Sequence, residues 1–525
     1  MTSGRWIVVL ASLSAALAAC ATLLGIEDFV DDAGPTSSGA DGGTTTGAGG
    51  SATGTGTGTT NGGGGGAAPV SYVCDWSRQL PSSSHAHAAG AAVNADGSSV
   101  TIAIAGWFVG QLDLGGSTLV SQYGEQSDGY VAAFDLDGEL RWQHDLGENG
   151  VQRALAVAVD APFNVAVVGS FEHDLYLGPS SIITNSEPTG AAQDLFVTLF
   201  TSNGALNERF GIGNGAAAQE ARAVAIDGSN RVAVGGSFTD DGGGGVDFGG
   251  GAVSALSRDG FVAGYDGALD YRWHNIAGGS SNDGVWGLAA DEVGQVYAVG
   301  SYRSAITWGG VALPVTGEED VFVAKTNPDG TPSWIATYGD DQTETAHAVA
   351  VEGAEIVVVG EFLNQIDFDG DADAGAPHQS NGSADLFVVK LRDEGDEPTY
   401  QWSHTFGGSG DDVAYDVNID RATGDVVVTG VVEGDADFGQ GILPGDDRDA
   451  FVLVLSPTGE TLWAARFGGD LEQEARGVAF DHEGNVVVHG HGQGVLDFGC
   501  GPTIDAGAPD AAVTQDLFLV KLRRD

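Results

Sequence analysis

The sequence predicts an all-β fold, a seven-bladed β-propeller of four-stranded blades, and three observations lead to it. An Asp-x-aromatic-Val motif, with Leu replacing Val in the last copy, returns at Asp128, Asp194, Asp259, Asp320, Asp385, Asp449 and Asp516. Successive copies are 66, 65, 61, 65, 64 and 67 residues apart, a spacing typical of a repeated supersecondary unit. Each copy contains four strand-like runs, and no helical periodicity follows the N-terminal leader.

The composition agrees with short strands joined by tight turns. The chain has 85 Gly and 15 Pro among 525 residues, and 8% of its residues are aromatic. Its net charge is -53, with only 20 Lys and Arg. A phosphate backbone would be repelled by such a surface, so nucleic acid is excluded as a partner.

The first residues predict a signal peptide over 1–19. Arg5 precedes an apolar run from Trp6 to Leu17, and small residues lead to Cys20. The segment Leu-Ala-Ala-Cys resembles the lipobox of bacterial lipoproteins, which implies a lipid on Cys20. In a Gram-negative envelope the resemblance also implies sorting to the outer membrane, because Ala21 follows the cysteine. The alternative is an uncleaved anchor, since about 20 apolar residues can span a bilayer.

Residues 20–70 form the predicted lipidated N-terminus and linker. From Asp31 to Pro69 the sequence is almost entirely Gly, Thr, Ser and Ala. Such a segment has too few apolar side chains to offset the entropy of ordering, so we expect a flexible tether. About 40 residues of this kind span roughly 35 Å. The propeller is predicted over 71–525.

Within each repeat, four patterns predict four strands. An alternating run ends in an acid, as at 154–160, and a Gly- and Asn-rich turn leads to a continuous apolar run, as at 486–490. The Asp-x-aromatic-Val strand follows, and a Trp-x-x-x-apolar-Gly strand completes the unit, as at 334–339. Leu206 replaces the Trp in the second repeat. Large and small residues alternate on the first strand, as in Val224 and Ala225, which suits packing of one blade on the next.

The two ends of the repeat region predict ring closure. The last repeat stops at Asp525 without a Trp strand, whereas an unassigned strand, Trp76 to Leu80, precedes the first. We expect this N-terminal strand to complete blade seven beside Asp516 to Leu522 and so to remove two free sheet edges.

With these repeats, the chain resembles the bacterial beta-propeller repeat (SBBP-type) family of large secreted and surface proteins. The resemblance covers the whole repeat region. It implies the propeller fold but no shared activity, because the repeated residues are structural.

Acidic residues offer two candidate calcium sites. The seven repeat aspartates invite calcium, but one acid at the start of a strand more simply accepts backbone N–H groups. Asp367, Asp369, Asp371 and Asp373 crowd one loop of blade five and could surround calcium, or form a solvated acidic loop. The loop is not an EF-hand, because Ala374 and Ser380 stand where its glycine and glutamate belong. No other cofactor is predicted, although His489 and His491 make a zinc site conceivable.

We expect Cys74 and Cys500 to stay unpaired. Cys74 begins the closing strand, while Cys500 follows the second strand of blade seven, at the opposite end of the blade. A strand separates such ends by roughly 17 to 20 Å, well beyond the roughly 7 Å between Cα atoms that a disulfide permits. Pairing would require the loop to fold back.

The inner-strand position five residues before the terminal acid varies most between repeats. It holds Ala89, Leu155, Arg222, Trp286, His347, Tyr415 and Arg476. This position lies at the mouth of the predicted axial channel, where arginines could bind an anionic or carbohydrate ligand and aromatic rings could stack on it. The alternative is that these side chains only plug the channel and pack between blades.

These features predict a monomeric, lipid-anchored binding or scaffold protein of the cell envelope, with an envelope protein or glycan as partner. No catalytic residue is predicted. One alternative is a propeller enzyme acting on polysaccharide, which needs two carboxylates at the channel entrance. On the inner strands we identify only Asp416, which is off-pattern. A second alternative is an assembly factor for outer-membrane proteins.

Overall fold

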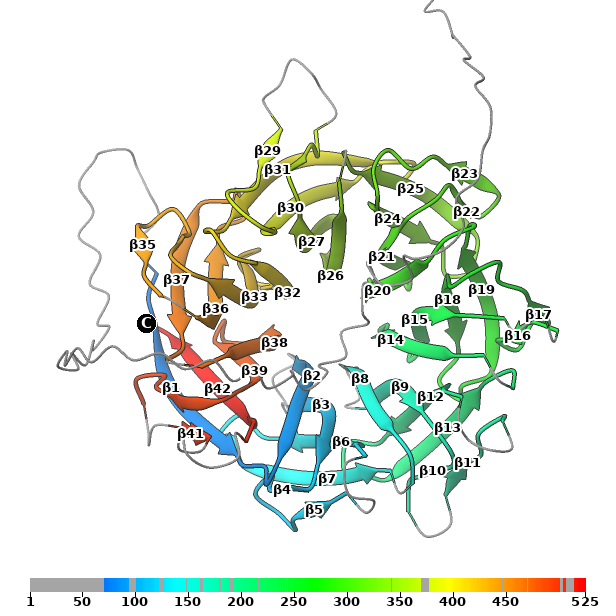
Figure 1. The fold of residues 1–525 in the computed structure, drawn as a ribbon, viewed down its shortest axis with the longest axis horizontal. Helices are drawn as coiled ribbons and strands as arrows, with labels where there is room; N and C mark the ends of the chain where they lie inside the picture. Colours follow the sequence, from blue (N-terminus) through cyan, green and yellow to red (C-terminus); the bar gives the residue numbers. More distant parts are fainter. Residues whose placement is uncertain are drawn as a thin grey trace, which may run out of the picture. The chain divides into compact units, whose positions relative to one another are not determined.

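The computed structural model describes residues 70–525, except 94–100, 122–125, 148, 161–163, 179–180, 188–191, 216, 241, 243, 341, 370–376, 446, 470, 501–503 and 507–513. The described residues form seven four-stranded antiparallel sheets around a central axis (Figure 1). The predicted seven-bladed β-propeller is therefore confirmed. No helix long and apolar enough to cross a membrane occurs in the described part of the chain. Cys20, Asp371 and Asp373 lie outside the described residues.

In blades one to six, the strands follow chain order from the axis outward. Blade one consists of β2 (His85–Val93), β3 (Ile102–Val109), β6 (Asp128–Phe134) and β7 (Leu140–Leu146). Blade two consists of β8 (Gln152–Val159), β9 (Val165–Phe171), β12 (Asp194–Phe200) and β13 (Leu206–Ile212). Blade three consists of β14 (Gln219–Ile226), β15 (Val232–Phe238), β18 (Asp259–Tyr265) and β19 (Tyr271–Ala277). Blade four consists of β20 (Asp283–Ala290), β21 (Val296–Tyr302), β24 (Asp320–Thr326) and β25 (Pro332–Tyr338). Blade five consists of β26 (Glu344–Glu352), β27 (Glu355–Phe362), β30 (Asp385–Asp393) and β31 (Pro398–Phe406). Blade six consists of β32 (Val413–Ile419), β33 (Val426–Glu433), β36 (Arg448–Leu455) and β37 (Thr461–Phe467).

Blade seven is built from both ends of the repeat region. Its strands, from the axis outward, are β38 (Gln473–Phe480), β39 (Val486–Gly492), β42 (Asp516–Arg524) and β1 (Tyr72–Leu80). β1 pairs antiparallel with β42, with Trp76 opposite Lys521. The predicted closure is confirmed, and the closing strand starts at Tyr72, four residues before the expected Trp76. The ring leaves no unpaired outer edge on β42.

Neighbouring blades pack large residues against small ones, as expected from the alternating inner strands. Val224 of blade three belongs to the same apolar cluster as Ala156 and Ala158 of blade two. Val417 of blade six lies in a cluster with Ala350 of blade five. Small residues on one blade therefore leave room for the branched residues of the next.

The repeat aspartate is a structural residue in the blades where its partners are described. Asp320 accepts hydrogen bonds from the backbone N–H groups of Thr316 at 2.7 Å and Gly317 at 3.0 Å. The glycine that ends the Trp strand makes room for this carboxylate, because a Cβ on Gly339 would lie 2.5 Å from Asp320. The expectation that the aspartate satisfies loop N–H groups is thus confirmed here. The close approach of Gly339 to Asp320 explains why both the aspartate and the glycine are repeated.

A small hairpin joins the second and third strands of each blade, a feature that the sequence analysis missed. In order, the hairpins are β4 (Gln111–Leu112) and β5 (Leu119–Val120), β10 (Leu175–Tyr176) and β11 (Ile182–Ile183), β16 (Val246–Asp247) and β17 (Ala252–Val253), β22 (Ile306–Trp308) and β23 (Val311–Leu313), β28 (Gln365–Ile366) and β29 (His378–Gln379), β34 (Ala436–Asp437) and β35 (Ile442–Leu443), and β40 (Gly494–Leu496) and β41 (Ile504–Ala506). An aspartate shapes the turn: Asp247 Oδ1 accepts the N–H groups of Gly249 and Gly251 at 2.8 and 2.9 Å.

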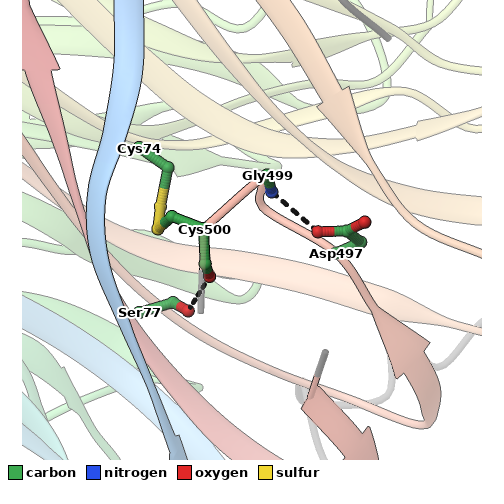
Figure 2. Close-up of a disulfide and its surroundings, with 5 residues drawn as sticks. All are labelled: Cys74, Ser77, Asp497, Gly499 and Cys500. Atoms are coloured by element: carbon green, nitrogen blue, oxygen red, sulfur yellow. Dashed lines mark hydrogen bonds between the residues drawn. A yellow bond between two sulfur atoms is a disulfide. The ribbon is translucent and has the colours of Figure 1, made fainter. Parts of the chain in front are cut away.

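The expectation that Cys74 and Cys500 stay unpaired is wrong. The two cysteines form a disulfide, with Cα atoms 5.5 Å apart (Figure 2). The prediction placed the loop after β39 at the far end of the blade, but its hairpin folds back along β1. Phe498 packs against Phe518 of β42, with ring centroids 5.1 Å apart. The Ser77 hydroxyl then donates a hydrogen bond to the Cys500 carbonyl at 2.9 Å.

Candidate functional site

Every innermost strand carries a β-bulge at the same position. In β14 the pairing with β15 shifts between Ala221 and Ala223, so that Arg222 is the extra residue. Equivalent shifts in the other six blades single out Ala89, Leu155, Trp286, His347, Tyr415 and Arg476. These seven residues, here called the bulge ring, are the variable positions identified in the sequence. A bulge re-aims its side chain relative to a regular strand.

A glycine on the second strand of each blade makes the bulge possible. A Cβ on Gly430 would overlap the carbonyl oxygen of Val413, two residues before the bulged Tyr415, and would lie 2.9 Å from the ring of Phe451. The same overlap with the corresponding carbonyl exists at Gly106, Gly169, Gly236, Gly300, Gly360 and Gly490. Repeated glycine therefore marks close backbone approach, and the constant scaffold holds seven variable residues.

One group of contacts in the bulge ring, here called the first arm, joins blades three and four. The Arg222 guanidinium lies 5.3 Å from the ring centroid of Trp286 and forms a 2.7 Å ion pair with Glu220. Trp286 Nε1 donates a hydrogen bond to the Ser301 hydroxyl at 2.9 Å. Ser301 in turn donates to Glu319. The indole and the guanidinium are thus fixed by partners on both blades.

The second arm joins blades five, six and seven around Tyr415. The Arg476 guanidinium lies 3.8 Å from the Tyr415 ring centroid, and the His347 ring lies edge-on at 5.8 Å. Arg448 donates a hydrogen bond to the Tyr415 hydroxyl at 3.1 Å. Arg476 also pairs with Glu474 at 2.5 Å. Burial raises the pKa of Tyr415 well above its usual value, so the hydroxyl stays protonated.

This arm continues across the closing seam to blades one and two. The His87 ring stacks on Trp107 with centroids 3.8 Å apart, and the Arg153 guanidinium lies 4.8 Å from the same indole. His491 stands between, with its ring 4.7 Å from His87 and Nε2 3.8 Å from Glu474. Burial, reinforced by the neighbouring His87 and Arg476, lowers the pKa of His491 well below its usual value. The seam histidine is therefore neutral at physiological pH.

The conceivable zinc site at the seam gains no support from the contacts. His489 uses both ring nitrogens, one toward the Phe518 carbonyl at 2.9 Å and the other toward the Tyr130 hydroxyl at 3.0 Å. Burial lowers its pKa to about 4. In the described part of the chain, no group of three or more His, Cys, Asp or Glu side chains is placed to hold a metal ion.

The bulge ring combines inter-blade packing with partial exposure. Its contacts run between neighbouring blades, as the packing alternative expects, but 16% of the Arg222 side chain and 19% of the Arg476 side chain remain exposed. Ligand binding by Arg222, Trp286, His347, Tyr415 and Arg476 stays a prediction. The polar partners of the ring were not predicted from the sequence; they are Glu220, Glu474, Arg153, Arg448 and Trp107. Aligning the repeats two residues before each bulge would have found the first three.

The statement that the inner strands carry only Asp416 as an off-pattern carboxylate is wrong, because Glu220 and Glu474 also lie on them. Asp416 itself joins two blades. Its carboxylate accepts the N–H groups of Val417 at 2.9 Å and of Val478, in blade seven, at 2.8 Å. Burial raises the pKa of Asp416 to about 7, against the effect of these hydrogen bonds.

Two of the four residues of the calcium hypothesis can be placed. Asp367 Oδ1 accepts the N–H of Asp369 at 3.1 Å, the turn contact that Asp247 makes in blade three. Asp367 thus shapes the turn of the blade-five hairpin, as the equivalent Asp247 does in blade three. Calcium binding by this loop stays a prediction, and a calcium titration followed by melting temperature, with Asp369→Asn as control, tests it.

Comparison with known proteins finds solved structures that are similar at low sequence identity. No family model and no curated protein matches the chain. Sqt1 from Chaetomium thermophilum is 12% identical, covers 85% of this chain and 90% of its own, and has a TM-score of 0.40. A rhamnogalacturonan lyase from Bacillus licheniformis is 10% identical, with 83% and 77% covered and a TM-score of 0.25. The resemblance to the SBBP-type family stays a prediction, and the fold assignment rests on the sheet topology.

Proposed function

We propose that this protein is a binding protein of the cell envelope, held there by a lipid on Cys20, and that the bulge ring is its binding surface. One observation carries the proposal. The same bulge occurs in all seven blades, and the residue at it changes from Ala or Leu to Arg, Trp, His, Tyr and Arg.

The scaffold around each bulge supports a binding role. The residue before the bulge is apolar and buried in every blade, and it is alanine in all blades but the fourth: Ala88, Ala154, Ala221, Val285, Ala346, Ala414 and Ala475. A rigid scaffold that carries variable polar side chains, among them the partly exposed Arg222 and Arg476, is the arrangement by which proteins present recognition residues. If the bulge ring served only to pack neighbouring blades together, apolar residues would suffice at these positions, because they avoid the free-energy cost of burying charge.

The remaining parts of the proposal come from the N-terminal sequence. The lipobox-like segment supports a lipid anchor, and the linker after it would hold the propeller away from the membrane. In a Gram-negative cell the anchor would place the protein in the outer membrane. The partner would then be an envelope protein or a glycan, bound by a monomeric propeller without catalysis.

Co-purification from envelope extract tests the binding surface. The Arg222→Ala/Arg476→Ala variant should lose the retained partner, whereas Arg209→Ala, an exposed arginine on the outer strand β13, should keep it. If the wild type, the double variant and Arg209→Ala retain the partner equally, the assignment of the bulge ring as the binding surface is overturned. Labelling with a palmitate analogue tests the anchor separately, because Cys20→Ser should abolish the label.

A further inference from the structure

We infer that the bulge ring binds a neutral, hydroxyl-rich ligand, a saccharide, and does not serve as a site for a simple anion. The inference rests on the proposed function, namely that this surface binds a ligand. It comes from the way in which the arginines of the ring are paired.

The arginines on blades three and four are already balanced by glutamates. Arg222 pairs with Glu220 at 2.7 Å, and Arg303 pairs with Glu319 at 2.9 Å. The Glu220 and Glu319 side chains are only 15% and 6% exposed, so these pairs are largely shielded from water. A phosphate or sulfate would have to break the pairs or approach the carboxylates, and either step is unfavourable.

Blades five to seven show the same balance. Arg448 and Arg476 share Glu474 at 3.2 and 2.5 Å, so two positive charges face one carboxylate there. Glu361 lies on the other side of Tyr415, beside His347 at 3.4 Å, and is 25% exposed. Its negative charge opposes the excess from the arginines, so the part of the arm in blades five to seven is also close to neutral.

Paired donors and acceptors match hydroxyl groups. A sugar hydroxyl donates one hydrogen bond and accepts others, so it can lie between a guanidinium N–H and a carboxylate oxygen. Arg448 Nε is buried and has no hydrogen-bond partner among the described residues. The Tyr415 hydroxyl accepts a hydrogen bond from Arg448 at 3.1 Å. The arm therefore offers donors beside the carboxylate of Glu474.

The aromatic rings hold the polar groups in place. Trp286 lies under Arg222, and Tyr415 lies under Arg476, at 5.3 and 3.8 Å from ring centroid to guanidinium. A stacked guanidinium loses less side-chain entropy when a ligand binds, because it is already ordered. Directional hydrogen bonds to an uncharged ligand benefit most from such pre-organisation.

Glycan binding by the full chain, measured in 50 and 500 mM NaCl, tests the ligand class. Probes are neutral oligosaccharides, uronate-containing oligosaccharides and inorganic phosphate. We expect binding of a neutral oligosaccharide whose Kd changes less than about twofold with salt, because screening acts on net charge. Arg222→Ala/Arg476→Ala should weaken this binding at least tenfold, and Arg209→Ala should leave it unchanged. Tyr415→Phe, which keeps the ring, should weaken it without unfolding the protein.

The other outcomes separate this inference from the proposed function. Binding of only anionic probes, weakened by salt and by the arginine substitutions, would overturn the neutral ligand and leave the binding surface standing. Retention of an envelope protein through the same arginines, without any glycan binding, would also overturn the saccharide alone. If neither glycan nor protein binding depends on these residues, both the inference and the proposed function fail.

Discussion

The disulfide between Cys74 and Cys500 should hold the propeller closed, and replacing both cysteines by serine tests this. It joins residues 426 apart in sequence, so it encloses nearly the whole ring. For a loop of this size, the chain-entropy relation gives about 6 kcal/mol of stabilisation as an upper limit. Measured disulfides give about 2 to 5 kcal/mol. We expect the double variant to lose stability in that range.

Thermal unfolding translates this loss into a measurable shift. About 450 ordered residues have an unfolding entropy of roughly 0.9 kcal/mol/K, so the melting temperature should fall by about 2 to 5 °C. Among the described strands, β1 pairs only with β42 and should detach first, so limited proteolysis should cut the variant faster near Leu80. Ser77→Ala is the matched control, since it removes only the hydrogen bond to the Cys500 carbonyl and should cost about 1 kcal/mol.

A stabilising disulfide would be contradicted if the oxidised wild type and the Cys74→Ser/Cys500→Ser variant melt at one temperature and resist protease equally. It would also be contradicted if alkylation and mass spectrometry of the unreduced protein find both thiols free. Reduction of the wild type should reproduce the behaviour of the variant.

Three further predictions concern the fold. Gly430→Ala should lower the free energy of unfolding in urea by about 1 to 3 kcal/mol or more, because its Cβ would overlap the Val413 carbonyl. Gly228→Ala is the control and should be neutral, because its Cβ would lie 3.8 Å from the nearest atom. Burial and nearby Asp259 raise the pKa of Asp283 to about 7. The folded state therefore binds its proton more tightly than the unfolded state, and stability should decline as pH rises from about 4 to about 7. Asp283→Asn should reduce the difference in melting temperature between pH 5 and pH 8, and an unchanged difference would contradict the assignment. Deleting residues 70–80 should expose the edge of β42 and cause association in size-exclusion chromatography; a stable monomer would argue against closure by β1.

The repeated part of the fold could be predicted from the sequence because the ring repeats each constraint seven times. The Asp128-to-Asp516 series gave the number and register of blades, and the absent Trp strand of the last repeat pointed to the closing strand. Both follow from local patterns and from the need to pair sheet edges. Position 222 and its equivalents also stood out, because variation against a constant repeat is visible in one sequence.

The contacts outside the regular strands could not be predicted in the same way. The Cys74–Cys500 disulfide depends on a hairpin that folds back along β1, and strand length alone placed the cysteines too far apart. The partners of Arg222 and Arg476 are glutamates two residues away, on the same strand but before the bulge. A regular strand also places residues two apart on one face, but the bulge itself was not recognised, and it decides where both side chains point.

Site-specific photo-crosslinking at the bulge ring tests the proposed binding surface most directly. A benzophenone amino acid replaces Leu155, the partly exposed bulged residue of blade two, or Leu256, which is 85% exposed beyond the hairpin of blade three. After irradiation in intact envelopes, we expect an adduct from position 155 and none from position 256. Adducts of equal yield from both positions, or an adduct from position 256 alone, would contradict the assignment of the bulge ring as the binding surface.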